Sequence, residues 1–155
     1  MKKQGLTLAL LVVSALVLTG LGNGATAATT KLRATLTAAE VVPTPRTGPT
    51  AARGGFRGVI VKRGKRTYLT FALSFQRLSS SARVAAIHLG RRGSTGPVLI
   101  SLCVAPASPC GLSVNGARPL TFKALRALKN GTAYIMVQTR EFPRGEIRGQ
   151  IKVVR

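Results

Sequence analysis

The sequence predicts an all-β protein, an antiparallel β-sandwich or Greek-key barrel with one short helix. Three observations lead to this fold class. Apolar residues recur at every second position over several segments, glycine and proline interrupt these segments at short intervals, and one segment alone has helical periodicity. Segments with a period of two bury one face and leave the other in water, as strands of antiparallel sheets do. Many short strands joined by turns are therefore expected.

Three segments carry the clearest alternation, and each is predicted to be a strand with one packed face. They cover residues 32–36, 69–75 and 147–153. In the first two, the inward positions are Leu32, Ala34, Leu36, Leu69, Phe71, Leu73 and Phe75. In the third, Ile147, Gly149, Ile151 and Val153 are expected to face inward, and Arg148, Gln150 and Lys152 to face water.

The connections follow from turn-forming residues. Arg63-Gly64-Lys65 is predicted to be a hairpin turn, because glycine tolerates a positive φ. Loops are expected at residues 92–97, 108–109 and 142–145, and a long connection at residues 42–52. Residues 97–103 are apolar enough for a buried strand. Residues 122–129 are the one helical segment, and Asn130-Gly131 should end it.

The N-terminal segment has the pattern of a secretory signal peptide. A basic start at Lys2 and Lys3 precedes an apolar run from Leu6 to Leu18, and Ala25-Thr26-Ala27 has the form of a cleavage site. We expect residues 1–27 to be removed and residues 28–155 to form a single exported domain. No other run reaches the ~18 apolar residues of a membrane-spanning helix. The predicted location is therefore the cell envelope or the extracellular space.

Charge limits the chemistry. The chain has a net charge of +21, its acids are Glu40, Glu141 and Glu146, and it contains no Asp. Loss of Lys2 and Lys3 with the signal peptide would lower the net charge from +21 to +19. Glycosidase chemistry needs two carboxylates around one bond, and a Ca²⁺ site needs a cluster of oxygen ligands. We therefore expect no enzyme activity, no catalytic residues, no metal and no cofactor.

The two cysteines, Cys103 and Cys110, are expected to form a structural disulfide, because the chain is predicted to be exported. In the chain-entropy model such a short loop contributes roughly 2.5 kcal/mol. The alternative is a redox-active pair, for which a Cys-x-x-Cys spacing would be typical.

Positive residues concentrate in the first predicted hairpin and its approach. Arg46 precedes the group, and the candidate polyanion-binding residues are Arg53, Arg57, Lys62, Arg63, Lys65 and Arg66. A field of this strength attracts polyanions such as anionic envelope polymers, acidic polysaccharides, anionic lipid surfaces or extracellular DNA. The alternative is that these residues only keep the surface solvated. No motif indicates sequence-specific binding of nucleic acid, and few aromatic residues remain for base stacking.

Several motifs resemble the chordin-type (CHRD) domain family. Residues 36–43 resemble its opening L-x-G-x-x-E-V-P-P, and residues 85–98 resemble A-H-I-H-x-G followed by G and G-P-V. Residues 128–139 resemble L-x-x-G-x-x-Y-V-N-V-H-T, and residues 145–150 read G-E-I-R-G-Q. The ordered set covers about residues 32–153. The chain thus resembles a bacterial-type, single-domain secreted member of that family.

The resemblance implies an immunoglobulin-like or superoxide-dismutase-like β-barrel without a settled catalytic activity. Where the family has His-x-His, this chain has Ala86-Ile87-His88, and where it has V-H-T, this chain has Val137-Gln138-Thr139. One imidazole is too few ligands for copper or zinc. A dismutase-related metalloenzyme is therefore the weakest alternative for function.

The remaining motif residues have two interpretations, a structural one and a ligand-binding one. His88 is a hydrogen-bonded residue at a strand end or a surviving metal ligand. Glu146 and Arg148 are tied to neighbouring backbone or other charges, or they contact a ligand at the barrel mouth. The structural interpretation is favoured for the whole set, which comprises Glu40, His88, Gly96, Gly131, Tyr134, Gly145, Glu146, Arg148 and Gly149.

Together these observations predict an exported, non-enzymatic CHRD-like binding or structural module. Its expected partners are anionic envelope polymers or an extracellular protein. The alternative is a basic envelope protein that adsorbs polyanions through charge alone.

Overall fold

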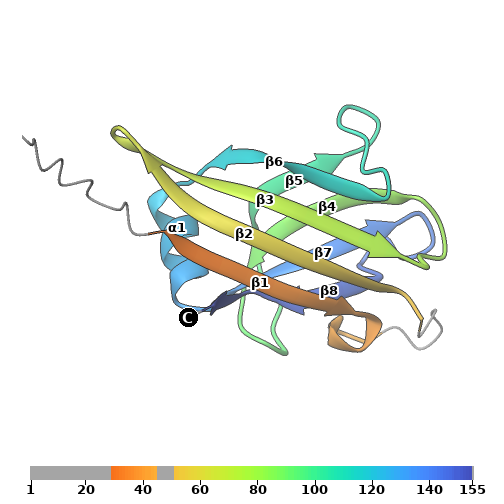
Figure 1. Cartoon of the computed structure of the whole chain (residues 1–155). Coiled ribbons are helices and arrows are strands. Elements are labelled where there is room, and N and C mark those ends of the chain that lie inside the picture. The colour runs from red at the N-terminus through yellow and green to blue at the C-terminus, as the bar shows by residue number, and fades with distance from the viewer. Residues whose placement is uncertain (1–28, 45–50, 155) are drawn as a thin grey trace, which may run out of the picture.

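The computed structural model describes residues 29–44 and 51–154, in which nine strands form one antiparallel sheet that curls into a nearly closed barrel (Figure 1). The all-β prediction is confirmed. Along the sheet the order is β5-β4-β7-β8-β1-β2-β3-β6, and β9 also pairs with β1. The strands are β1 (Thr30–Thr37), β2 (Arg53–Arg63), β3 (Arg66–Gln76), β4 (Ala82–Leu89), β5 (Val98–Val104), β6 (Ser113–Pro119), β7 (Ala133–Thr139), β8 (Ile147–Gln150) and β9 (Lys152–Val154).

The barrel has a front layer of β1, β2, β3 and β6 and a back layer of β5, β4, β7 and β8 (Figure 1). Their inner faces meet in a core that contains Leu36, Phe56, Leu69, Ile87 and Ile135. The predicted alternation of the first two segments is confirmed, since every second residue of β1 and β3 is buried. The alternating apolar residues of these two strands are therefore the ones that face the core.

β2 and β3 form a long hairpin that extends beyond its neighbours (Figure 1). Its turn contains Gly64 at φ +58°, as predicted. Pairing with β1 ends at Ile60, and pairing of β3 with β6 ends at Tyr68. Among the strands that the structure describes, none pairs with the outer edges of the hairpin tip, residues 61–67.

The predicted third alternating strand is wrong in part. The chain forms β8 and β9 with a break at Ile151, whose N–H donates to the Ala133 carbonyl. Arg148 is only 2% exposed, whereas Val153 is 39% exposed. The arginine is buried because a loop covers the outer face of β8. The valine is partly exposed because β9 has β1 as its single paired neighbour.

The helix α1 (Phe122–Lys129) has the predicted bounds. The Thr121 hydroxyl caps its start by accepting a hydrogen bond from the Ala124 N–H at 3.2 Å, and Gly131 at φ +67° follows its end. Ala124, Ala127 and Leu128 face the core. Across residues 29–44 and 51–154, no helix has the length and apolar character needed to span a membrane.

The barrel closes between β5 and β6 through a side chain. These strands end the sheet order, and no backbone ladder joins them. Arg118 of β6 donates to the carbonyls of Ser101 and Leu102 in β5 at 3.2 and 3.0 Å. The edge position also explains why β5, predicted to be buried, is only half-buried, with Ile100 inside and Val98 54% exposed.

Candidate functional site

The family-motif residues gather on the outer face of the back layer. A covering loop, residues 90–97 between β4 and β5, lies over this face. Beneath it, His88 of β4 and Tyr134 of β7 are directly paired and their rings stack at 5.1 Å between centroids. The Arg148 guanidinium lies 3.6 Å from the Tyr134 ring centroid. The three side chains form one stacked cluster, which explains why a charged residue is buried there.

Each member of this cluster holds the covering loop. The Tyr134 hydroxyl accepts a hydrogen bond from the Gly96 N–H at 3.2 Å, and His88 Nδ1 bonds the Gly96 carbonyl at 3.1 Å. Arg148 Nη2 donates to the carbonyls of Arg91 and Ser94 at 3.0 and 2.6 Å. A Cβ at Gly96 would lie 1.9 Å from the Leu89 carbonyl oxygen, so only glycine fits. The polar groups of the cluster are thus engaged within the protein.

His88 is held in its neutral form. Burial lowers the pKa of His88, the hydrogen bond to the Gly96 carbonyl raises it, and the positive charge of Arg148 lowers it further, with a net shift below the usual 6.5. Since Nδ1 faces a carbonyl acceptor, Nδ1 carries the proton and Nε2 is the unprotonated nitrogen. Protonation would place a second cation beside Arg148 without a counter-charge.

This depressed pKa predicts a pH-dependent stability. The unfolded chain binds a proton at His88 near pH 6.5, while the folded chain does so only at lower pH. Stability is therefore fully present above about pH 6.5 and is lost as the pH falls through the folded pKa. We expect the Tm to decrease between about pH 7.5 and about pH 5. Thermal melts across this range measure the decrease.

His88 is the chain's single histidine, so the assignment can be checked directly. In H88N, whose amide N–H can still donate to Gly96, the slope over this pH range should disappear. An imidazole NMR resonance that titrates at or above pH 6.5 would contradict the predicted shift.

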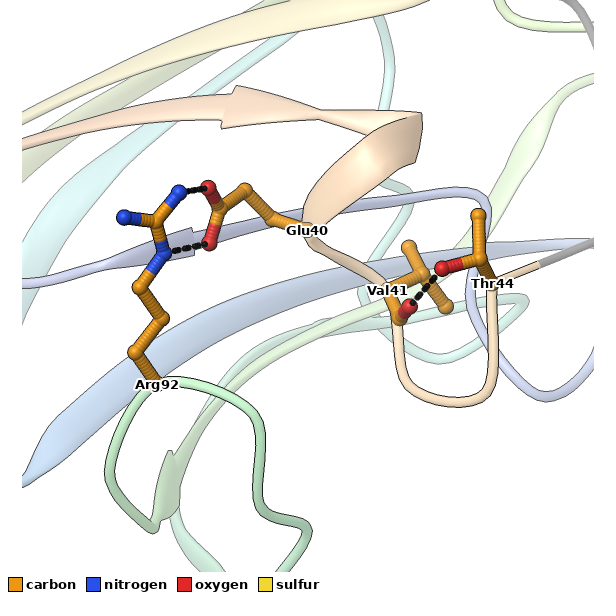
Figure 2. A network of polar contacts seen from close by, with 4 residues as sticks. All are labelled: Glu40, Val41, Thr44 and Arg92. Carbon is orange, nitrogen blue, oxygen red and sulfur yellow. Dashed lines mark hydrogen bonds and ion pairs between the residues drawn. The ribbon is translucent and has the colours of Figure 1, made fainter.

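The covering loop is also tied to the start of the domain. Arg92 donates from Nε to Glu40 Oε2 at 3.0 Å, and its Nη2 bonds Oε1 of the same carboxylate (Figure 2). Glu40 lies in the single-turn 3-10 helix η1 (Ala38–Glu40), after β1. Next to it the Thr44 hydroxyl donates to the Val41 carbonyl at 3.2 Å (Figure 2). Glu40 thus has a cationic partner, which is a structural role of the kind predicted for the motif residues.

Glu146 is buried among hydrogen-bond donors instead of facing a ligand. It is 1% exposed. Its carboxylate accepts from the Ser79 N–H at 2.7 Å, from the Ser79 hydroxyl at 2.9 Å and from the Thr139 hydroxyl at 2.7 Å. The carboxylate therefore joins the segment after β3 to the end of β7. It is not within salt-bridge distance of Arg148.

Two glycines of the motif allow neighbouring segments of the protein to approach closely. Gly145 has φ +123°, and a Cβ there would lie 2.6 Å from Met136 Sδ. A Cβ at Gly149 would lie 2.3 Å from the Thr35 carbonyl oxygen, where β8 meets β1. Next to it, the two N–H groups of the Gln150 side-chain amide are shared among three carbonyl oxygens, those of Gly90, Gly131 and Ala133, at 2.9 to 3.0 Å from Nε2. The motif thus connects the front layer, the back layer and the covering loop.

The three positions at which the family has histidines lie on one face of the sheet, but the residues found there in this chain do not form a metal site. Positions 86, 88 and 138 all lie on the outer face of the back layer. Here they are Ala86, His88 and Gln138, and His88 Nδ1 is already bonded to Gly96. No group of three or more His, Cys, Asp or Glu residues lies together in the described ranges. The donor set therefore does not fit copper or zinc.

The predicted disulfide is confirmed. Cys103 and Cys110 are bonded with their Cα atoms 5.3 Å apart, and both are buried. The bond fixes the start of the β5–β6 connection against β5. Neither sulfur is a free thiol in the structure.

The candidate polyanion-binding residues do not form one patch. Arg53 begins β2, Arg57 lies near its middle, and the other four lie at the hairpin tip, which is about 30 Å from Arg53 along an extended strand. These four are Lys62, Arg63, Lys65 and Arg66. All six are exposed. Arg46 lies outside the described residues.

Strand pairing creates a basic group that the linear sequence does not reveal. Arg33 of β1 is paired directly with Arg57 of β2 on one side and Lys152 of β9 on the other. All three side chains are exposed on the outer face of the front layer. We call these three residues the basic row. Alternation in β1 predicts that Arg33 faces out, but only the strand order shows what lies beside it.

Comparison with known proteins gives one match. A family model described as CHRD domain matches residues 32–151. No curated protein and no solved structure matches the chain. The matched range runs from within β1 to the residue before β9, so it covers β2 to β8 and most of β1, and it includes every motif residue placed above.

Proposed function

The chain belongs to the CHRD domain family, and on this basis we propose that it is an exported, non-enzymatic binding module of the cell envelope or the extracellular space. A CHRD domain indicates a small binding or structural module. The observation that carries the proposal is the division between two sets of polar residues. The motif residues are engaged in internal contacts, whereas the basic residues are exposed and largely unpaired.

The internal contacts support the absence of enzyme activity. Among the imidazole and the three carboxylates, Glu141 is exposed and Glu40 is paired with Arg92. His88 and Glu146 are buried and bonded to their neighbours. They also lie apart, since His88 contacts the covering loop and Glu146 contacts Ser79 and Thr139. A general acid or base must reach the proton it transfers, and these groups face other parts of the protein.

Charge supports an anionic partner. Of the three acids, Glu146 is buried and Glu40 is paired with Arg92, so Glu141 is the remaining exposed carboxylate in the described residues. The outer surface is thus strongly positive, and its field favours polyanions. The disulfide is compatible with an oxidising compartment.

The proposal is tested by binding of the mature domain, residues 28–155, to isolated cell envelopes and to purified anionic polymers across a salt series. We expect binding at low salt that weakens as salt rises. The Lys and Arg side chains displace counterions from the polyanion, and added salt opposes this release and screens the attraction. Binding that depends on salt alone and ignores polymer identity would favour adsorption through charge. Absence of binding to any anionic polymer would contradict an anionic partner and direct the search to an extracellular protein.

A further inference from the structure

The outer face of the front layer has features of a binding site. The geometry points to a site for a linear polysaccharide that carries carboxylate groups, centred on the basic row of Arg33, Arg57 and Lys152. This inference rests on the proposed function and names the ligand class of the module. Its components are a row of unpaired cations, two hollows that meet at Arg33, and small polar side chains.

The basic row places like charges side by side. Paired residues of neighbouring strands lie about 5 Å apart, and like charges at such positions destabilise a sheet. The one salt bridge in the described part of the chain joins Arg92 to Glu40, so no carboxylate there offsets the row. An anionic ligand with repeated charges would relieve this repulsion. The cations recur across the strands at about 4.8 Å, a spacing comparable to one sugar unit.

Two shallow hollows meet at the basic row. One, of about 490 Å³, lies over β1, β2, β3 and β6, and Arg33 and Arg57 border it. The other, of about 670 Å³, lies over β1 and β9, and Arg33 and Lys152 border it. Arg33, Ala34 and Thr35 line both. The hollows therefore form a continuous path across the strands that passes the whole row.

The lining residues fit a sugar chain. Gly55 and Ala72 have little or no side chain, so the first hollow is open above them. Thr35, Ser74 and Asn115 supply groups that can bond sugar hydroxyls. The planar guanidinium of an arginine matches a carboxylate in a bidentate geometry.

One feature of this face disfavours nucleic acid, and another sets the direction of the path. The one aromatic residue that lines either hollow is Phe56, which is 1% exposed, so no ring is available to stack on a nucleobase. At the far end of the second hollow, Arg92 is already paired with the Glu40 carboxylate. The cations that an acidic chain can pair with therefore lie toward β1 and β2. The path for the ligand thus runs from β9 across β1 and β2 toward β6.

A matched pair of variants tests the site. R33Q/R57Q removes two arginines that are paired across β1 and β2. R140Q/R144Q removes two arginines of the β7–β8 connection, which line neither hollow. Both lose the same charge from exposed positions. With oligogalacturonate at ~0.15 M salt, we expect R33Q/R57Q to lose about tenfold or more in affinity. R140Q/R144Q should lose less than about threefold, because it changes the long-range field alone.

The outcomes separate the site from the proposed function. Equal losses in the two variants would overturn the site and leave adsorption through charge. Wild-type protein that binds no anionic polymer would contradict the proposed function itself. Tighter binding to duplex DNA or poly(glycerol phosphate), with the same dependence on Arg33 and Arg57, would overturn the assignment to a carboxylated polysaccharide. Equal Tm values for both variants and wild type show that the comparison reports binding.

Discussion

Replacing Gly149 with alanine is expected to reduce the free energy of unfolding by about 3 kcal/mol, or about 10 °C in Tm. The added Cβ would lie 2.3 Å from the Thr35 carbonyl oxygen and 2.8 Å from its carbonyl carbon. Both atoms belong to the backbone of β1, which is paired with β2 along its whole length. Relief of the clash therefore requires β1 and β8 to separate, since no flexible side chain can move aside. Urea denaturation of G149A measures the loss.

Gly55 provides the matched control, because it is paired with Thr35 from the opposite side. A Cβ at Gly55 would have a single neighbour, the Ser74 hydroxyl oxygen at 3.9 Å. The free energy of unfolding of G55A is therefore expected to stay within about 0.5 kcal/mol of wild type. The added Cβ meets no clash, and alanine has less conformational freedom than glycine in the unfolded chain. A G149A protein as stable as G55A would show that β8 does not cross β1 this closely.

Replacing Glu146 with alanine is expected to reduce the free energy of unfolding by about 3 kcal/mol, because three donors lose the acceptor that the buried carboxylate supplies. These donors are the Ser79 N–H, the Ser79 hydroxyl and the Thr139 hydroxyl, at 2.7 to 2.9 Å from the carboxylate. The two bonds from Ser79 join segments 67 residues apart in sequence. Their loss should also increase hydrogen exchange at the Ser79 amide.

Glu141 is the control for charge. It lies in the same β7–β8 connection, is exposed, and its substitution raises the net charge by the same amount. E141A should remain within about 0.5 kcal/mol of wild type. If E146A and E141A lost equal stability, the effect would come from net charge, and the hydrogen bonds of Glu146 would contribute little.

Local features of the fold could be predicted from the sequence. The alternation in β1 and β3, the turn at Gly64 and the helix bounds depend on residues close in the chain, so periodicity and glycine conformation determine them. The error at Arg148 has a different origin. Its burial depends on the covering loop, which begins 58 residues earlier at Gly90, and no pattern around residue 148 records that contact.

In the candidate site, too, the features that depend on residue type could be predicted and those that depend on distant contacts could not. A paired cysteine, a partner for Glu40 and structural roles for motif glycines could be anticipated from residue type and compartment. The basic row could not, because residues 33, 57 and 152 are distant in sequence and meet only through the pairing of β9, β1 and β2. Grouping positive residues by proximity in the chain instead selected the hairpin tip, which lies apart from the row.

The closure of the barrel by Arg118 has a consequence for how the domain opens. Every other pair of neighbouring strands in the sheet order is joined by backbone pairing, whereas β5 and β6 are joined by the hydrogen bonds of one guanidinium. Motion along this line is therefore the least costly way to let water reach Phe71 and its neighbours. The domain is in this sense a curled sheet with a preferred opening line.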